Sequence, residues 1–410
     1  MLGSPLRSFA TLGRPVVKPS PAPGRASVLS LMCDGVEMDF FGVWLRDHCP
    51  QELDPTTQQR QVDTVALPLD ITPYDVSVSS GGDLRVVWPG DPPHVSFYDS
   101  DWLARHGLPA GGDAAAGKHD PATDSSSRVL FGADTFEGGG LPTVRHDDVM
   151  ASDDALFDAL CMLRDYGFVM VDGTEVSEAA TKAITERIGF IRPTLYSPDM
   201  WMTEVLPDGN DTAYTSNPLA AHTDGCYWVC LECPGIQVFH CLQEATEGGD
   251  TLLVDGFNVI HQLSQRYPDA YDFFTSTLLP FHHTDPDNDL RTWKPVIKLD
   301  AAGNVTEFSY NNEDRAVTDL PRHAVEPFYR HLGELMSIVR DPANELWIKL
   351  RPGTTIFIHN IRVMHGRSAF SSVSGRKLSG CYVNQEDFAS RLRSLATKRG
   401  VGVHRAESVG

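Results

Sequence analysis

The residues best suited to chemistry are two histidines and one aspartate in two short segments. His222 and Asp224 lie two apart in the stretch 221–225, and His365 follows far downstream, within 363–367. Side chains of an extended segment alternate between two faces, so His222 and Asp224 are expected to point to the same side. Two imidazoles and one carboxylate are the ligand set of non-haem Fe(II) oxygenases, which leaves three coordination positions open. The sequence therefore predicts an iron centre formed by these three residues.

Two further residues stand in the order that is typical of oxygenases using 2-oxoglutarate. Arg376 follows His365, and a guanidinium at this place can bind the far carboxylate of 2-oxoglutarate through two parallel hydrogen bonds. Thr251, in a strand-like apolar segment, offers a hydroxyl as a second anchor. With fifteen histidines, chance pairs of His and Asp are frequent, so the prediction depends on all these features together.

The elements that must position these residues are predicted mainly as strands. The 410 residues, 41% of them hydrophobic, are ample for a large core. Strand-like segments dominate beyond a predicted helix over 178–188, with helices expected near 259–266, 268–275 and 324–339. Many strands with helical insertions, carrying a ligand set split between two distant segments, predict a mainly β fold with helices, in which the catalytic domain is a double-stranded β-helix of jelly-roll type.

The composition divides the chain into five parts. Residues 27–106 alternate short strands and turns, which predicts a small β-rich N-terminal domain. Residues 107–140 are rich in Gly, Ala and Ser and predict a flexible linker, before the oxygenase domain over 141–396 and a C-terminal tail over 397–410. Residues 1–26 hold four basic residues and no acidic one, which is typical of a mitochondrial transit peptide, but five prolines fit a disordered tail equally well. We therefore expect a mitochondrial protein, with the cytoplasm as the alternative.

Charge and cysteine usage exclude several classes of partner. A net charge of −21 argues against nucleic acid or an anionic membrane surface and favours a cationic substrate. The sequence contains no apolar run of about eighteen residues, so no membrane span is predicted. Eight cysteines at irregular spacing indicate reduced thiols rather than a disulfide framework. Cys226, Cys230 and Cys233 could be interpreted as zinc ligands, but structural zinc usually takes four ligands, and a buried apolar cysteine is more common.

Longer motifs make the chain resemble one known family. Over residues 43–395 it is similar to the γ-butyrobetaine dioxygenase family of Fe(II)/2-oxoglutarate-dependent oxygenases, which includes the trimethyllysine dioxygenases. The motifs lie at 44–47, 211–215, 222–224, 235–241, 251–257, 311–312, 314–317 and 365–367. The stretches 211–215 and 344–350 favour the trimethyllysine branch. The resemblance implies C3 hydroxylation of Nε-trimethyl-lysine, the first step of carnitine biosynthesis, with γ-butyrobetaine or another quaternary ammonium substrate as the alternative.

The resemblance also implies the cofactors, the assembly and the substrate contacts. The enzyme would use Fe(II), 2-oxoglutarate and O2, with ascorbate as reductant, and would be a homodimer. A quaternary ammonium group donates no hydrogen bond, so aromatic ring faces hold it. The implied cage consists of Tyr196, Trp201 and Tyr214. Asp211 would face the amino end of the substrate, and Asn311 or Asn312 its carboxylate, although each of these residue types also occurs in cores and turns.

Three departures from the family pattern are visible. One extra residue separates Tyr196 from Trp201, so the cage geometry is expected to differ. The family binds a zinc in its N-terminal domain through several cysteines and one histidine, but only Cys49 and His94 match here, so we expect no structural zinc. His359 and Ile361 stand where the family has Asp and Trp, which is expected to change the surroundings of the iron ligands.

The sequence also argues against two functions of other classes. A non-catalytic binding protein on an oxygenase fold conflicts with the complete ligand set and with Arg376. A secreted zinc hydrolase would need an HExxH helix or a closed set of cysteine ligands, and the sequence has neither.

Overall fold

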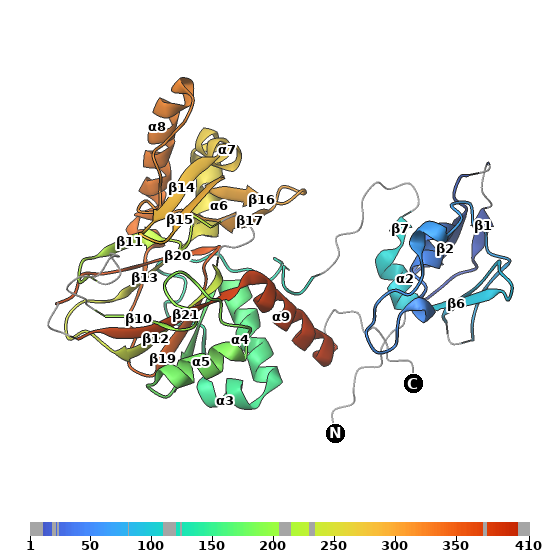
Figure 1. Ribbon diagram of the computed structural model, residues 1–410, viewed down its shortest axis with the longest axis horizontal. Coiled ribbons are helices and arrows are strands. Elements are labelled where there is room, and N and C mark those ends of the chain that lie inside the picture. The colour runs from blue at the N-terminus through green and yellow to red at the C-terminus, as the bar shows by residue number, and fades with distance from the viewer. Residues whose placement is uncertain are drawn as a thin grey trace. The chain divides into compact units, whose positions relative to one another are not determined.

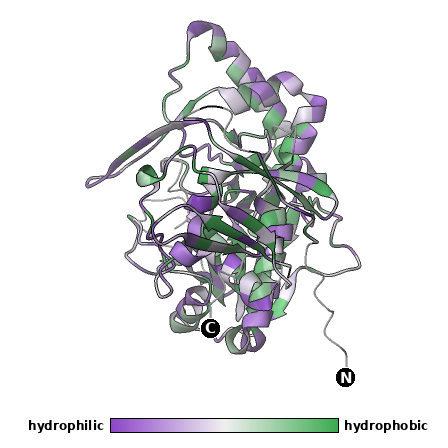
Figure 2. Cartoon of the chain, turned by 90° about the vertical axis from the view of Figure 1, so that its right-hand side faces the viewer, coloured by the Kyte–Doolittle hydropathy of each residue, from purple (hydrophilic) through white to green (hydrophobic). Residues whose placement is uncertain are grey.

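The computed structural model describes residues 11–18, 22, 24–80, 82–109, 120–123, 125–204, 215–228, 234–371 and 375–400. These residues fall into two compact units, 11–109 and 120–400, each described by itself below. Figure 2 shows hydrophobic residues concentrated in the strands, while hydrophilic and hydrophobic residues alternate along the helices. The prediction of a mainly β protein with helices is confirmed. Within the described residues, no helix is both long enough and apolar enough to cross a membrane.

The N-terminal unit contains two antiparallel sheets around one core. The first has the order β1-β2-β3-β7 and the second the order β4-β5-β6. The strands are β1 (Val16–Lys18), β2 (Val28–Cys33), β3 (Val36–Phe41), β4 (Asp75–Val78), β5 (Leu84–Trp88), β6 (His94–Tyr98) and β7 (Leu108–Pro109). The short helices are α1 (Gly42–Asp47), η1 (Pro50–Glu52), η2 (Thr64–Ala66) and α2 (Ser100–His106). Leu31, Phe40, Leu45, Val86 and Trp88 are buried together, so both sheets share this core.

The larger sheet of the second unit has six strands in the order β10-β21-β12-β19-β9-β8. They are β8 (Thr143–Arg145), β9 (Phe168–Asp172), β10 (Trp201–Thr203), β12 (Pro234–Gln243), β19 (Thr354–His359) and β21 (Lys377–Asn384). All neighbours are antiparallel except β8 and β9. Packed beside it are α3 (His146–Ala151), α4 (Asp153–Tyr166), α5 (Glu178–Glu186) and α9 (Gln385–Arg399). Because both faces are covered, β9 and β12 are buried almost continuously.

A smaller antiparallel sheet faces the larger one. Its strands, in the order β11-β20-β13-β18, are β11 (Leu219–His222), β20 (Val363–Arg367), β13 (Thr251–Asp255) and β18 (Leu346–Ile348). Leu253 and Val363 of this sheet share a buried cluster with Phe168 and Ile356 of the larger sheet. The two sheets therefore enclose one core between them.

Helices and two hairpins cover the other side of the smaller sheet. The helices are α6 (Gly256–Arg266), α7 (Pro268–Ser276) and α8 (Arg322–Val339), followed by η4 (Pro342–Asn344). The hairpins pair β14 (Leu279–Thr284) with β15 (Asp289–Lys294), and β16 (Ile297–Leu299) with β17 (Val305–Phe308). Figure 1 shows α6, α7 and α8 beyond β13 and β20, on the side away from α4, α5 and α9. The three helices lie where the sequence predicted them.

The segment that the sequence predicted as a linker is partly packed into the second unit. Contacts divide the chain at residue 120 rather than at residue 141. Phe131 is fully buried and joins the core between the sheets. Phe136 packs against the same core, and the backbone of Phe131 is hydrogen-bonded to Asp255 and Asn258. A low content of bulky residues therefore does not by itself indicate a flexible segment.

The most deeply buried ion pair ties four segments together. Arg362, between β19 and β20, donates to both carboxylate oxygens of Asp255, the last residue of β13, at 3.1 and 2.8 Å. The carboxylate also accepts the backbone N–H groups of Phe257, at the start of α6, and of Phe131, at 3.0 and 3.1 Å.

The remaining N–H groups of Arg362 bind backbone carbonyls. They reach Arg164 and Asp165, in the last turn of α4, at 3.1 and 3.0 Å, and Val129 at 2.6 Å. Carbonyls in the last turn of a helix have no partner within the helix, so the guanidinium satisfies them. This pair therefore fixes the strand that carries His365 against β13, α4 and the segment 129–131.

A second buried polar group, His240 on β12, faces helix α5. Its Nδ1 lies 2.7 Å from the hydroxyl of Thr181, and its side chain is fully buried. Burial lowers the pKa of His240 from 6.5 to about 4, and the nearby His146 acts in the same direction. The folded unit therefore holds this imidazole neutral.

We expect Arg362→Met to lower the free energy of unfolding of the second unit by about 3–5 kcal/mol, because Asp255 would remain buried without a cation. Urea denaturation followed by far-UV circular dichroism measures this. Arg393→Met is the matched control, because Arg393 pairs with Asp120 at the surface, where a loss below about 1 kcal/mol is expected. Equal losses in the two variants would show that the buried pair has no special role.

We expect His240→Asn to reduce the loss of stability on acidification. Neutral His240 contributes stability that is fully present above pH 6.5 and is lost as the pH falls towards 4, because the unfolded chain takes up the proton first. The wild type should lose up to roughly 3 kcal/mol more than the variant over this interval. His261→Asn, at an exposed position of α6, is the control and should follow the wild type. Identical pH profiles for all three proteins would contradict the prediction.

Candidate metal centre and its cavity

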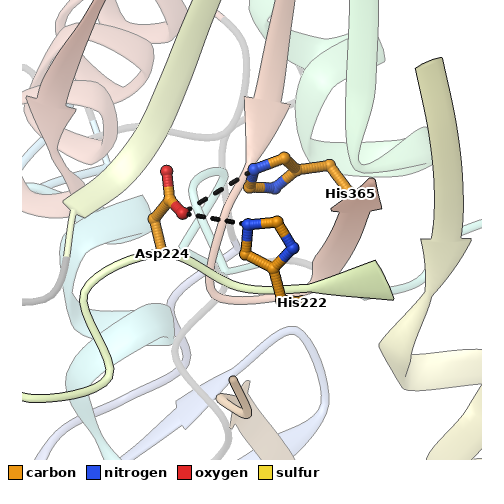
Figure 3. A group of neighbouring side chains, drawn as sticks. All are labelled: His222, Asp224 and His365. Atoms are coloured by element: carbon orange, nitrogen blue, oxygen red, sulfur yellow. Dashed lines mark ion pairs between the residues drawn. The ribbon is translucent and has the colours of Figure 1, made fainter. Parts of the chain in front are cut away.

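Two histidines meet because their strands pair. His222 ends β11, His365 lies in β20, and the two are direct cross-strand partners with ring centroids 4.4 Å apart. Asp224 follows just beyond the end of β11, and its Oδ1 lies 3.3 Å from Nε2 of His222 and 3.7 Å from Nε2 of His365 (Figure 3). One potential ligand atom of each residue lies within 4.8 Å of the others. The structure thus brings together the three residues that the sequence predicted as metal ligands.

The hydrogen bonds of His222 favour one tautomer. Its Nδ1 lies 2.7 Å from the carbonyl oxygen of Ala220, which can only accept a hydrogen bond. Nδ1 therefore carries a proton, and Nε2 is the nitrogen that faces Asp224 and His365. This is the atom with which His222 would bind a metal ion.

The three groups differ in charge. Burial opposes a charge on His222, but the hydrogen bond and the negative charge of Asp224 raise its pKa to about 9. Although burial acts against it, the same histidines hold the pKa of Asp224 well below its ordinary value. Burial and the charge of His222 lower the pKa of His365 to about 3. A divalent cation would therefore meet one carboxylate and one neutral imidazole, and would displace a proton from the other imidazole.

A cavity of about 770 Å³ adjoins these residues. Six other residues singled out in the sequence line it: Tyr196, Trp201, Thr251, Asn311, Asn312 and Arg376. Asp211 and Tyr214 lie outside the described residues. Every predicted site residue that the structure describes thus lines the cavity, and these residues come from segments between residues 196 and 376.

A buried cation that forms no ion pair with any described residue lies in the cavity wall. Arg376 is 7% exposed, and within the described chain no residue forms a hydrogen bond or ion pair with it. Burial lowers its pKa, and its charge adds to burial in lowering the pKa of Arg367 to about 10. Thr251 is the cross-strand partner of Arg367 and lines the same wall. Because a buried charge needs compensation, this group of residues fits an anionic ligand, such as a carboxylate.

Aromatic rings form another part of the wall. Tyr196 and Tyr227 share a hydrogen bond between their hydroxyls at 2.8 Å. The ring of Trp201 lies 5.7 Å from that of Tyr382 and packs on Gly380, where a Cβ would be 2.1 Å from the indole. Tyr227, Trp228 and Tyr382 were not singled out in the sequence. The alternation of β21 could have indicated Tyr382, because residues 378 and 382 share the face that lines the cavity.

Asp224 is held by residues that the sequence analysis did not single out as site residues. Its Oδ2 accepts hydrogen bonds from the hydroxyl of Tyr382, at 2.7 Å, and from the amide of Gln237. Its backbone N–H donates to Asn360 at 2.9 Å. All three partners lie on or next to the larger sheet, whereas both histidines lie on the smaller sheet.

Of the two substituted residues near the distal histidine, His359 contacts α9 and Ile361 contacts β17. Nε2 of His359 lies 2.9 Å from the side-chain oxygen of Gln385, and its ring packs near Phe388. Ile361 accepts the backbone N–H of Phe308 through its carbonyl oxygen. His359 therefore interacts with α9, which packs outside the larger sheet. The family pattern did not indicate this contact.

The groups that the sequence analysis weighed and disfavoured as zinc ligands form hydrogen bonds in the structure. In the N-terminal unit, Sγ of Cys49 lies 3.2 Å from Nε2 of His94, 3.0 Å from the hydroxyl of Ser96 and 3.3 Å from Oε1 of Gln51. This set lacks further thiolates or imidazoles and does not fit a closed zinc site. Cys226 is fully buried near Thr223, whereas Cys230 and Cys233 lie outside the described residues.

Comparison with known proteins gives a consistent result. The family model described as "Taurine catabolism dioxygenase TauD, TfdA family" matches residues 123–382. The trimethyllysine dioxygenase of Meyerozyma guilliermondii is 33% identical over 375 residues, which cover 88% of this chain and 91% of that protein. The mitochondrial trimethyllysine dioxygenase of Rattus norvegicus is 33% identical over 90% of this chain and 85% of its own. The gamma-butyrobetaine dioxygenase of Homo sapiens is 29% identical over 89% of this chain and 93% of its own.

The matched region contains the two histidines, the aspartate, Arg376 and Thr251. Because the family model covers more than half of the chain, and relatives of 33% identity cover most of it, this chain belongs to the TauD, TfdA family of dioxygenases.

Proposed function

We propose that this chain is an Fe(II)- and 2-oxoglutarate-dependent dioxygenase that hydroxylates Nε-trimethyl-lysine at C3, the first step of carnitine biosynthesis. The observation that carries the proposal is the meeting of His222, Asp224 and His365 beside a cavity lined by several aromatic rings and by a guanidinium that forms no ion pair with any described residue. The higher identity to trimethyllysine dioxygenases than to a gamma-butyrobetaine dioxygenase, 33% against 29%, favours this substrate.

The donor set fits the cofactors that the family uses. Two imidazole nitrogens and one carboxylate oxygen would hold Fe(II), and the guanidinium of Arg376 with the hydroxyl of Thr251 would hold the far carboxylate of 2-oxoglutarate. When bound, iron and 2-oxoglutarate would supply the activation of O2 that inserts one oxygen atom into a C–H bond. The chain itself orients both reactants and excludes water from them. Ascorbate would serve as reductant.

The aromatic wall suits a quaternary ammonium group. Tyr196 and Trp201 would face the trimethylammonium end, together with Tyr214. Such a group cannot donate hydrogen bonds, so each ring face contributes up to about 2 kcal/mol through its negative quadrupole. Asp211 would meet the amino end of the substrate, and Asn311 or Asn312 its carboxylate. The negative net charge of the protein favours the approach of a cation.

The architecture is part of the proposal. The two antiparallel sheets that enclose one core support a double-stranded β-helix as the catalytic domain, preceded by a small β-rich domain that needs no zinc. A homodimer is the proposed assembly. Names of vertebrate relatives that include the word mitochondrial support that compartment, with the cytoplasm as the alternative.

Protein supplied with Fe(II), 2-oxoglutarate and ascorbate should convert trimethyl-lysine to a product heavier by one oxygen atom and form one succinate per turnover, as measured by mass spectrometry. His222→Ala should abolish both products while the circular dichroism spectrum is retained. Turnover of γ-butyrobetaine but not of trimethyl-lysine would support the dioxygenase activity and contradict the proposed substrate. Normal succinate formation by His222→Ala would refute the metal centre.

Trp201→Ala should raise the apparent KM for trimethyl-lysine by about 10- to 30-fold, because one desolvated cation–π contact is lost. The KM for 2-oxoglutarate should not change, since its anchors are Arg376 and Thr251. Trp293→Ala, at an exposed position of β15, is the matched control and should leave both constants unaltered. An unchanged KM for the substrate in Trp201→Ala would remove this residue from the cage.

A further inference from the structure

The two carboxylate oxygens of Asp224 have different surroundings. Oδ1 faces Nε2 of His222 and of His365, at 3.3 and 3.7 Å. Oδ2 points the other way and accepts hydrogen bonds from the Tyr382 hydroxyl, at 2.7 Å, and from the Gln237 side-chain amide. Two donors on Oδ2 engage it fully, so Oδ1 is the oxygen that remains available on the side of the histidines.

The two donors form a rigid pair. Gln237 on β12 and Tyr382 on β21 are direct cross-strand partners in the larger sheet. Gln237 is 1% exposed and Tyr382 is also buried, and both side chains are hydrogen-bonded to the same oxygen of Asp224. A single hydrogen bond would leave the carboxylate free to rotate about its Cβ–Cγ bond, whereas two donors from neighbouring strands fix that rotation.

The orientation of Gln237 follows from the charge of its partner. The amide nitrogen must face the carboxylate, because the amide oxygen would be repelled. Oε1 of Gln237 is then left buried, and it has no hydrogen-bond partner among the residues that the structure describes. Burying an unsatisfied acceptor is unfavourable, and an apolar side chain of the same length would avoid it. A residue that only filled space would therefore not need to be glutamine.

The backbone of Asp224 is held separately. Its N–H donates to Oδ1 of Asn360 at 2.9 Å, and Nδ2 of Asn360 donates to the carbonyl oxygens of Asp224 and Pro234, both at 3.0 Å. Asn360 is 1% exposed and lies in the turn between β19 and β20. This turn leads into the strand that carries His365. Asn360 therefore links the backbone of Asp224 to the segment that precedes His365.

We propose that Gln237 is a positioning residue for the metal centre. With Tyr382 it holds the carboxylate of Asp224 so that a single oxygen, Oδ1, is presented to the cation, while Asn360 fixes the peptide of the same residue. Ligation by one carboxylate oxygen leaves more coordination positions open for other ligands than ligation by two. This inference rests on the proposed function of the three ligands, and it assigns to Gln237 a role in metal affinity rather than in folding.

The test is the affinity of the protein for Co(II) alone, titrated by calorimetry and by visible absorption, without substrate or 2-oxoglutarate. Gln237→Met keeps the length of the side chain and removes the donor, and Tyr382→Phe removes one hydroxyl from the same oxygen. Each should weaken Co(II) binding by about 10- to 100-fold, which is typical when a group that orients a ligand is lost. The melting temperature of the metal-free protein should stay close to that of the wild type.

Gln262→Met is the matched control. Gln262 lies on α6, donates to the side chain of Asn344 at 2.8 Å, and does not line the cavity. Its loss removes the same chemical group from another polar cluster of the second unit, so Co(II) affinity should stay within twofold of the wild type. His222→Ala should abolish the binding of one equivalent of Co(II).

The outcomes separate the two proposals. If the wild type binds no Co(II), or binds it equally well after His222→Ala, the metal centre itself is refuted and the role of Gln237 falls with it. If the wild type binds through His222 but Gln237→Met and Tyr382→Phe bind within twofold of it, only the positioning role is overturned. A lower melting temperature with unchanged Co(II) affinity would also overturn it, because Gln237 would then be purely structural.

Discussion

The buried ion pair between Arg362 and Asp255 is the constraint on which the rest of the second unit depends. It joins the end of β13 to the residue that precedes β20, and so fixes the register in which Asp255 pairs with Val363. In that register His365 is opposite Leu253. A shift by one residue would turn His365 away from the interior, because side chains alternate along a strand. The position of the distal histidine therefore follows from a charge pair that touches no ligand.

The metal centre is shared between two sheets with different tasks. The smaller sheet supplies His222 and His365 as cross-strand partners. The larger sheet supplies the groups that hold Asp224, with Gln237 and Tyr382 also paired across strands. Each sheet is internally rigid through its own hydrogen bonds. The distance between carboxylate and imidazoles consequently depends on how the two sheets pack, which the apolar core between them determines.

Different parts of the cavity wall would attract ligands of opposite charge. Arg376 and Arg367 place positive charge in one part of the wall. Burial lowers the pKa of both guanidinium groups, and the charge of Arg376 lowers that of Arg367 further. Asp224 and the aromatic rings of Tyr196 and Trp201 make other parts attractive to cations. A protein of net charge −21 thus has a positively charged patch in its cavity wall beside a part that would attract a cation. Such an arrangement suits a reaction between a dicarboxylate and a quaternary ammonium compound.

The sequence alone determined the features that depend on local spacing and residue type. Short-range patterns predict His222 with Asp224, the later His365 and Arg376, and the helices α6 to α8. They suffice because the residue types and the hydrophobic periodicity on which these predictions rest lie within a few residues. Tertiary structure alone decided the partners of Asp224, the strand order and the attachment of Phe131 to the second unit. The hydrogen bonds of Tyr382 to Asp224 and of Phe131 to Asp255 join residues more than a hundred positions apart in the chain. No local pattern encodes such contacts, because they are selected by the packing of the whole core.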